Sequence, residues 1–495
     1  MSHELSVDSS TPAVVLKLDA NVMHHGGLGV IRSLGRLGVP VYGVHEGPLA
    51  PAAGSRYLHG RWFWQPAQED TERLRSGLAR LADRIGRPAV LIPTDDAGAI
   101  FLAEHGDSLR QWFLFPAPPR DIPRRLAGKF SMYQLCRELD VPCPRAAVPG
   151  CLEEAREFAA TTGFPLVAKL TTPWRRGTRN SAVGNGAASN GAATNGAATN
   201  GAAKNGAQRS RPGLRSTTIA RDPAELEAIY LAGRDTGDDV MLQEFIPGGR
   251  GDDWFFHGYC DASSHCGPAF TGIKERSYPA HAGLTSLGRS ASNPRLRTEI
   301  ARLLARLAYR GIVDLDLRFD ARDGTYKLLD FNPRLGAQFR LFRDSAGIDV
   351  ARAQYLDLTA GALPGPAGTA GTGSAGAGGA GDTGHDQVDG RSFLVENYDP
   401  ISALSYWRGG ELGLRDWAAS VRGVDETAWF DRDDLRPFGL MCLHMGWHAI
   451  RRPLRGQRAH SAARFAAEPR YRRGRGAAKP GGKSPDQGNY EGKLA

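Results

Sequence analysis

The stretch 311–334, GIVDLDLRFDARDGTYKLLDFNPR, constrains this chain more than any other part of its sequence. Apolar and charged residues alternate strictly in its first half, which predicts a strand with one dry face. A three-residue loop, Arg322-Asp323-Gly324, follows, with glycine at the position that favours a left-handed backbone. A hairpin closed by this loop brings four polar side chains to one face in two facing pairs, Asp316 with Asp330 and Asp314 with Asn332.

The polar face of this hairpin predicts a magnesium site. Its three carboxylates and one amide supply only hard oxygen atoms, and Mg²⁺ prefers a few such ligands together with phosphate oxygens. Carboxylates this close repel one another when no metal is bound, which raises the pKa of one of them. Arg334 adds a fixed cation beside the acids. The alternative is an exposed hairpin face whose aspartates are solvated.

The N-terminal block, residues 12–125, predicts a parallel sheet. Apolar runs alternate there with stretches of helical spacing, as in βαβ units. The turn at Gly27-Leu28-Gly29 resembles half of a dinucleotide-binding fingerprint, but Arg32 stands at the third glycine position. We therefore favour a plain tight turn before a helix. The expected strands are 13–18, 39–44 and 89–96.

Composition divides the remainder of the chain. Residues 185–207 repeat every five residues without a large apolar side chain, so they read as a flexible insert. A second linker, residues 361–390, is rich in glycine and alanine. These inserts leave four further blocks: 126–240, which starts with a helix expected over 126–146; 241–360; a mixed segment at 391–450; and a tail at 451–495.

The formal charge of +9 lies entirely in the C-terminal tail. Residues 451–495 hold 12 Lys or Arg and 3 Asp or Glu, while the preceding 450 residues hold 50 of each sign. A nucleic-acid-binding domain carries its basic face within the folded part. We therefore expect a disordered tail and no specific nucleic-acid partner, with RNA or membrane contact by the tail as the alternative.

Other sequence features favour a cytoplasmic protein. No apolar run approaches the roughly 18 residues of a transmembrane helix, and the first ten residues lack the basic start and apolar stretch of a signal peptide. The six cysteines contain no CxxC pair, which fits a reducing compartment better than a disulfide framework. The spacing of His257, Cys260, His265 and Cys266 fits no common metal site.

Further polar residues stand where a nucleotide or a carboxylate is commonly bound. Lys169 ends an apolar strand and Lys129 begins a helix, although each alone is more often a surface lysine. Glu244 precedes a Pro-Gly turn, which frees strand backbone to bond a planar heterocycle. Strand parity places Lys274 and Arg276 on one face, either as a carboxylate-binding pair or as solvated charges.

The order of these residues resembles the ATP-grasp superfamily, particularly its carboxylate–amine ligases such as D-alanine–D-alanine ligases and D-aspartate ligases. The resemblance covers about 12–360 and is most specific over 126–334. It implies an α/β protein with a parallel-sheet N-terminal domain (12–125), a small lobe with its phosphate flap (126–240) and a large lobe with the metal hairpin (241–360). The mixed segment and the tail follow.

The resemblance also implies roles for individual residues. Lys129 and Lys169 would contact ATP phosphates. Arg334 would steady the phosphoryl group or the acyl intermediate. The adenine hinge would consist of Glu244, Phe245 and Ile246, with Asp252 at the ribose. One or two Mg²⁺ (or Mn²⁺) would be held by Asp316, Asp330 and Asn332. Two departures stand out: the family usually has Glu at position 330, and its short flap here contains the repeat insert.

The implied activity is ATP- and Mg²⁺-dependent ligation of a carboxylate to an amine through an acyl phosphate, with an amino acid as an expected substrate. Such chemistry needs charge neutralisation and in-line positioning more than a protein nucleophile. The alternatives are an ATP-dependent carboxylase or kinase with the same clamp, and a nucleotide-binding regulatory protein without turnover. A homodimer is the expected assembly.

Overall fold

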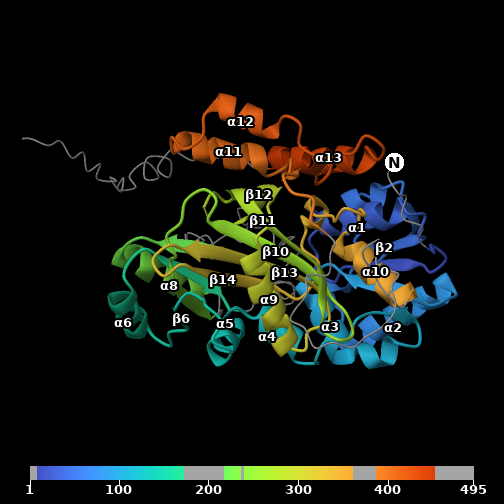
Figure 1. The fold of residues 1–495 in the computed structure, drawn as a ribbon, viewed down its shortest axis with the longest axis horizontal. Coiled ribbons are helices and arrows are strands. Elements are labelled where there is room, and N and C mark those ends of the chain that lie inside the picture. The colour runs from blue at the N-terminus through green and yellow to red at the C-terminus, as the bar shows by residue number, and fades with distance from the viewer. Residues whose placement is uncertain (1–7, 172–216, 236–238, 282, 361–385, 452–495) are drawn as a thin grey trace, which may run out of the picture. The chain divides into compact units, whose positions relative to one another are not determined.

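The computed structural model of the protein describes residues 8–171, 217–235, 239–281, 283–360 and 386–451. These residues belong to one compact unit that ends at Pro453. The expected α/β class is confirmed, with a five-stranded, a seven-stranded and a four-stranded sheet (Figure 1). Among the helices within these ranges, none is long and apolar enough to cross a membrane.

The N-terminal sheet is fully parallel, as expected from the βαβ alternation. The helices α2 (Thr71–Ile85) and α3 (Asp96–His105) begin at side-chain caps, Asp70 and Asp95. Two strands of this sheet, β3 and β5, were not predicted, because only Leu58 of the edge strand β3 is buried and β5 has just two residues. The sheet order β3-β2-β1-β4-β5 comprises β1 (Ala13–Leu16), β2 (Val41–His45), β3 (Leu58–Phe63), β4 (Ala89–Pro93) and β5 (Phe113–Leu114).

The glycines near the N-terminus lie within a helix, not in a turn before one. Helix α1 (Gly26–Gly35) begins four residues earlier than the expected start at Val30. A Cβ on Gly29 would lie 2.7 Å from the ring of Phe339, so glycine permits a close approach between α1 and the short helix η6 (Phe339–Leu341). Packing therefore explains this glycine without a nucleotide.

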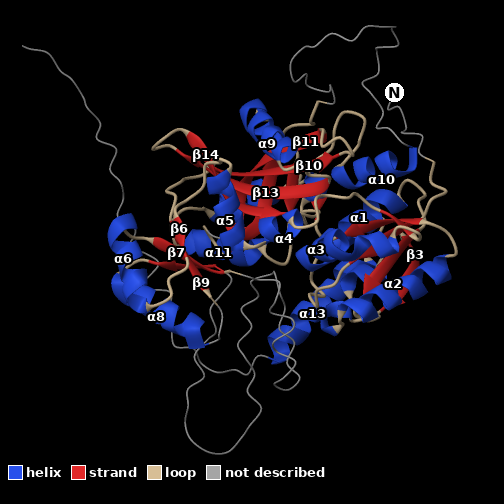
Figure 2. Cartoon of the chain, turned by 90° about the horizontal axis from the view of Figure 1, so that it is seen from below, coloured by secondary structure: helices blue, strands red, loops and turns tan. Residues whose placement is uncertain are grey.

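The four-stranded antiparallel sheet lies in the part of the chain that was predicted to form the small lobe, and α6 (Leu152–Thr162) and α8 (Pro223–Asp235) lie beside it (Figure 2). The helix expected over 126–146 is two helices, α4 (Ile122–Ala127) and α5 (Lys129–Glu138). Gly128 separates them with an extended backbone, which the expectation of one helix overlooked. The sheet order β6-β9-β7-β8 comprises β6 (Ala146–Ala147), β9 (Val240–Glu244), β7 (Leu166–Leu170) and β8 (Thr217–Ala220).

The seven-stranded sheet carries the predicted hairpin at one edge, in the order β14-β13-β10-β11-β12-β15-β16. Helices α9 (Pro294–Arg306) and α10 (Val350–Ala360) belong to this part of the chain. The apolar face of the hairpin packs into a core that includes Leu315, Leu317 and Phe331. The strands are β10 (Asp253–Cys260), β11 (Cys266–Tyr278), β12 (Leu284–Ser290), β13 (Gly311–Asp320), β14 (Thr325–Asn332), β15 (Ser392–Leu394) and β16 (Glu426–Thr427).

The predicted pairing of the metal hairpin is confirmed at the site, whereas its loop is one residue longer than expected. Asp316 faces Asp330 and Asp314 faces Asn332, but Asp320 pairs with Thr325. Gly324 is left-handed, with φ of 71°. A bulge at Leu329 shifts the register by one residue and offsets the longer loop. The polar pairs therefore occupy the predicted positions.

The second linker ends at 385, five residues earlier than expected. Gln387 donates to the Thr271 carbonyl and accepts from its N–H, both at 2.8 Å, so 386–390 belong to the folded part. The repeat insert 185–207, the rest of that linker and nearly all of the basic tail lie outside the described residues.

The C-terminal segment packs against two other parts of the chain through buried ion pairs. It contains α11 (Asp399–Arg408), α12 (Leu414–Val421) and α13 (Arg436–Arg451). Asp399 forms a bidentate pair with Arg276 of β11, at 2.8 and 2.9 Å. Asp434 accepts from Arg32 of α1 at 3.0 Å and from Ser55 at 2.7 Å. The segment is thus an integral part of the fold.

We predict that Arg32→Met destabilises the protein by about 3–5 kcal/mol, because it leaves the buried Asp434 carboxylate without its cation. The Arg32 side chain is 0% exposed. Arg36→Met is the matched control, since Arg36 is 31% exposed where it pairs with Asp431 and we expect a smaller effect there. Thermal melting of the three proteins checks this, and equal shifts for both variants would contradict it.

Candidate active site

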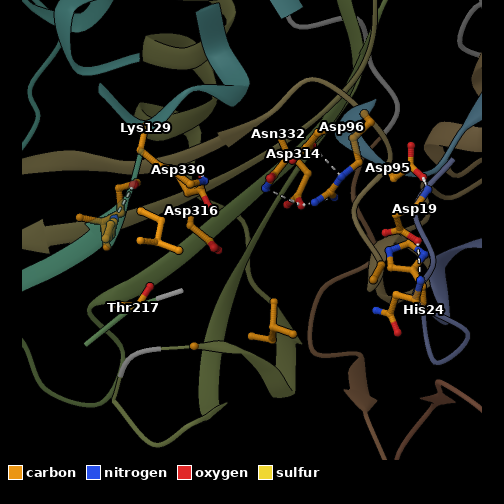
Figure 3. Close-up of a pocket in the computed structure, with 18 of the residues that line it drawn as sticks. Asp19, His24, Asp95, Asp96, Lys129, Thr217, Asp314, Asp316, Asp330 and Asn332 are labelled. Atoms are coloured by element: carbon orange, nitrogen blue, oxygen red, sulfur yellow. Dashed lines mark hydrogen bonds and ion pairs between the residues drawn. The ribbon is translucent and has the colours of Figure 1, made fainter. Parts of the chain in front are cut away.

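A cavity of about 840 Å³ brings together side chains from the four-stranded and seven-stranded sheets and from the segments that follow β1 and β4 of the N-terminal sheet (Figure 3). Its lining includes most of the residues that the sequence singled out, and also Asp314. The predicted residues in the lining are Lys129, Lys169, Glu244, Phe245, Ile246, Lys274, Asp316, Asp330, Asn332 and Arg334. Asp252 and Arg276 are not among the lining residues.

Each carboxylate of the metal hairpin pairs with its own cation. Lys129, the first residue of α5, forms an ion pair with Asp330. Lys274 of β11 lies 3.1 Å from Asp316. Arg334 lies 3.2 Å from Asp314, and its Nε donates to Asp96 at 3.2 Å. The hairpin acids are therefore neutralised from different elements of the chain.

The surroundings raise the pKa of Asp314 and lower the pKa of Asp330. Burial raises the pKa of Asp314 to about 7, and the charge of Arg334 opposes this rise. Burial also acts to raise the pKa of Asp330, but the nearby Lys129 and Lys169 outweigh it and leave that pKa lowered. Asp330 is therefore held in the charged form that binds a metal.

Lys169 reaches the cavity from β7 in the small lobe. Its Nζ donates to the carbonyl of Leu329 at 3.1 Å, the residue at the hairpin bulge. Burial lowers the pKa of Lys169 to about 8, while the charge of Asp330 opposes the shift. The bulge thus turns a main-chain acceptor toward a buried ammonium group.

The end of β9 carries the residues that were predicted to form the adenine hinge. The Glu244 carboxylate accepts from Arg322 at 2.8 Å and from the Arg145 N–H at 3.2 Å, so its side chain is already engaged. The Ile246 carbonyl accepts from Arg318 at 3.0 Å. Within the described ranges, no hydrogen bond occupies the main chain of Phe245. The main chain of Phe245 is therefore the group best placed to bond a heterocycle.

The structure corrects the expected placement of two residues. Asp252 accepts from the Gly249 N–H at 2.6 Å within the turn before β10, while the neighbouring Asp253 lines the cavity and pairs with Arg318. Arg276 does not share the strand face of Lys274, because the register of β11 shifts on both sides of Arg276. Its guanidinium is buried on Asp399 instead.

The acid face fits a magnesium ion by its chemistry, because Asp316, Asp330 and Asn332 offer only oxygen ligands on one face. As the side chains stand, no three His, Cys, Asp or Glu residues in the part of the chain that is described are gathered closely enough to hold a metal. Asp316 and Asp330 are instead paired with lysines. Metal binding would therefore require those ion pairs to rearrange.

Sequence reasoning missed the wall that the N-terminal domain contributes. Asp19, Asp95 and Asp96 line the cavity at the carboxyl ends of β1 and β4, together with His24 (Figure 3). Asp95 accepts from the N–H groups of Leu18, Asp19 and Gly98 at 2.5–2.7 Å. The sequence feature that could have predicted this wall is the pair of carboxylates at the end of the strand expected over 89–96, because parallel sheets bind ligands at the carboxyl ends of their strands.

Comparison with known proteins agrees with this geometry. No family model matches the chain. Among curated proteins, D-aspartate ligase of Enterococcus faecium (strain Aus0004) is 25% identical over 288 residues. This match confirms the resemblance to the ATP-grasp carboxylate–amine ligases. It covers 56% of this chain and 60% of the relative, so the chain spans less than two thirds of that relative's length.

Solved structures are similar at lower identity. An L-amino acid ligase from Bacillus licheniformis is 13% identical, with a TM-score of 0.47 over 70% of this chain and 74% of that chain. N5-carboxyaminoimidazole synthetase from Staphylococcus aureus, complexed with ADP, is 9% identical, with a TM-score of 0.47 over 72% and 79%. Scores of this size carry no inference about the site.

We predict that Asp330→Asn weakens Mg²⁺-dependent ADP binding by at least about tenfold, because it removes the charge of the predicted metal ligand and keeps its shape. Asp323→Asn in the same hairpin is the control, since Asp323 pairs with Lys327 away from the cavity. Calorimetric titration with ADP, with and without Mg²⁺, checks this. Unchanged Mg²⁺ dependence in Asp330→Asn, or unfolding of that variant, would contradict the role as a ligand.

We predict that Asp19→Asn flattens the pH dependence of the melting temperature. Burial and the charge of Asp95 raise the pKa of Asp19 from 3.8 to about 7. The folded protein therefore holds this proton more tightly than the unfolded chain does, and Asp19 lowers stability as pH rises from about 4 to about 7. Melting curves at several pH values check this, with Asp83→Asn on α2 as the control. An unchanged slope in Asp19→Asn would contradict it.

Proposed function

We propose that the protein is an ATP- and Mg²⁺-dependent ligase that joins a carboxylate to an amine through an acyl phosphate. The observation that carries this proposal is one cavity in which two lysines, an acid hairpin, the Glu244–Ile246 segment and an acidic N-terminal wall meet. The similarity to a D-aspartate ligase supports an amino-acid substrate.

The nucleotide lies, in this proposal, between the two lobes. Its base bonds the Phe245 main chain, and its phosphates replace Asp330 and Leu329 as partners of Lys129 and Lys169. A lysine ammonium binds phosphate as a compact point charge. Because Lys169 is buried and its pKa is lowered to about 8, a phosphate beside it would hold it in the charged form.

The hairpin would hold Mg²⁺ through Asp316, Asp330 and Asn332. When bound, the ion neutralises charge on the phosphates and orients them for in-line transfer. Asp316 and Asp330 would exchange their lysine partners for the ion, and those lysines would then pair with anionic ligands. In this way no buried charge is left without a partner.

The two chemical steps of this proposal require no nucleophile from the protein. A substrate carboxylate oxygen attacks the γ-phosphorus, and ADP leaves with the electrons of the broken P–O bond. The amine nitrogen then attacks the acyl carbon, phosphate leaves, and the amine loses a proton. Arg334 is placed to orient the carboxylate and the acyl phosphate, because it lines the cavity beside Asp314.

The acidic wall suits the amine substrate. An amine reaches the site as an ammonium ion, which favours neighbouring carboxylates. Asp96 is the wall residue that connects to the reaction centre, since it accepts from Arg334 at 3.2 Å. Asp19, whose pKa is raised to about 7, is suited to take up the proton that the amine loses.

We predict that ADP appears only when a carboxylate and an amine are both present, because the acyl phosphate needs an acceptor. A screen of amino-acid pairs for ADP and phosphate release checks this. Hydroxylamine should trap the intermediate as a hydroxamate.

The Arg334→Lys variant should lose most of the turnover while still binding ADP, because one ammonium cannot replace a guanidinium that bonds two acids.

Other outcomes would favour the alternative functions. ATP consumption driven by bicarbonate without hydroxamate formation would indicate a carboxylase, and a phosphorylated product that is stable to hydroxylamine would indicate a kinase. ADP binding without turnover on any pair would indicate a regulatory protein. The homodimer and the cytoplasmic location stay predictions.

A further inference from the structure

His257 of β10 lies in register with the metal hairpin. β10 pairs with β13 so that His257 faces Asp314, and β13 pairs with β14 so that Asp314 faces Asn332. Residues directly opposite in antiparallel strands place their side chains on one face, about 4.5–5.5 Å apart at Cβ. These three residues therefore form one row across the sheet, beside the row that holds Asp316 and Asp330.

The His257 ring is fully buried and makes no hydrogen bond through either nitrogen within the described part of the chain. It packs against Phe342, with ring centres 5.1 Å apart, and edge-on against Phe255. Its Nε2 lies 3.2 Å from Asp314 Oδ1, which is likewise buried and without a hydrogen bond. Such orphaned polar atoms are rare in protein interiors. Here the two orphans lie next to each other.

The backbone of Gly336 covers this pair. A Cβ at that position would lie 2.2 Å from His257 Cε1 and 2.6 Å from Asp314 Cγ, so only glycine fits. Burial lowers the pKa of His257 to about 3, and Arg334 adds to the effect, so the ring is neutral. A neutral imidazole has one N–H to donate. The acceptor within reach of Nε2 is Asp314 Oδ1.

The second oxygen of Asp314 connects this pair to the site. Its Oδ2 accepts from Asn332 Nδ2 at 3.2 Å and from Arg334 Nη1 at 3.2 Å. An amide held through its nitrogen leaves its oxygen free for another partner. The orientation of Asp314 therefore bears on where the Asn332 oxygen points, and Asp314 holds the Arg334 guanidinium together with Asp96 and the Leu335 carbonyl.

We propose that His257 is a positioning residue for the metal hairpin. In this proposal a small rotation of the ring points Nε2–H at Asp314 Oδ1, 3.2 Å away, and this contact keeps Asp314 Oδ2 on Asn332 and Arg334. His257 touches neither substrate nor metal, and acts through Asp314 alone. The inference rests on the proposed function, in which Asn332 is a magnesium ligand and Arg334 orients the acyl group.

The test compares His257→Leu, which removes the donor, with His257→Gln, whose amide nitrogen can take the place of Nε2. We expect His257→Leu to weaken Mg²⁺-dependent ADP binding roughly tenfold to hundredfold, the scale seen when residues behind a metal ligand are removed. Binding of ADP without Mg²⁺ should stay unchanged. His257→Gln should recover most of the loss. Calorimetric titrations measure all three effects without requiring turnover.

A double-mutant cycle with Asp314→Asn provides a second measurement. If His257 acts through Asp314, the double variant His257→Leu/Asp314→Asn should be no worse than Asp314→Asn alone. If His257→Leu does not fold, His257→Met takes its place. Equal losses in the Leu and Gln variants, equal losses with and without Mg²⁺, or additive effects in the cycle would each overturn the positioning role.

The two proposals fail in different ways. A protein that binds Mg²⁺ and ADP but ligates no substrate pair refutes the ligase function, while the variants still test His257. A His257→Leu protein with normal Mg²⁺-dependent binding refutes the positioning role, whatever its turnover. Absence of Mg²⁺-dependent binding in the unaltered protein refutes both.

Discussion

The three carboxylates on the hairpin β13–β14 need neighbouring cations, and the surrounding structure supplies them. A buried charge is stable only beside an opposite charge or hydrogen-bond donors. The cations come from separate elements: Lys129 begins α5, Lys274 lies on β11, and Arg334 follows β14. Arg334 also reaches Asp96 at the edge of the N-terminal sheet. The cavity lies where these elements converge on the hairpin.

The same ion pairs prepare the cavity for a charged ligand. Lys129 and Lys274 now neutralise carboxylates that, in the proposed function, would bind Mg²⁺. A metal nucleotide carries both signs of charge, so its ion can pair with the carboxylates while a phosphate pairs with Lys129 and another anionic ligand with Lys274. This exchange would leave neither the two carboxylates nor the two lysines unpaired. The buried contacts Arg276–Asp399 and Arg32–Asp434 belong to the framework and stay outside this exchange.

The alternation of apolar and polar residues predicted the structure best where it ran unbroken through a whole strand. It predicted the structure worst where one inserted residue shifted the strand register. The facing pairs of the hairpin were predicted, but its loop was not, because Gly324 suits a three-residue and a four-residue loop equally well. The bulge at Leu329 could not be recognised from the sequence, because the residues on either side of the bulge show no change in the apolar pattern. A similar shift in β11 separated Arg276 from Lys274, although strand parity had placed them together. Each bulge inserts one residue, and one residue turns a side chain to the other face.

The sequence by itself determined the α/β class, the parallel N-terminal sheet, the polar face of the hairpin and the order of the residues that are proposed to bind a nucleotide, because periodicity and spacing are local properties. Only the tertiary structure decided which charges meet. Asp96, Asp19 and His24 are far from the hairpin in sequence, and no local pattern predicts their place in its cavity. His257 likewise had no metal-ligand spacing, yet strand pairing sets it against Asp314. Contacts of this kind depend on how strands pair across the sheet, which the packing of the whole chain selects.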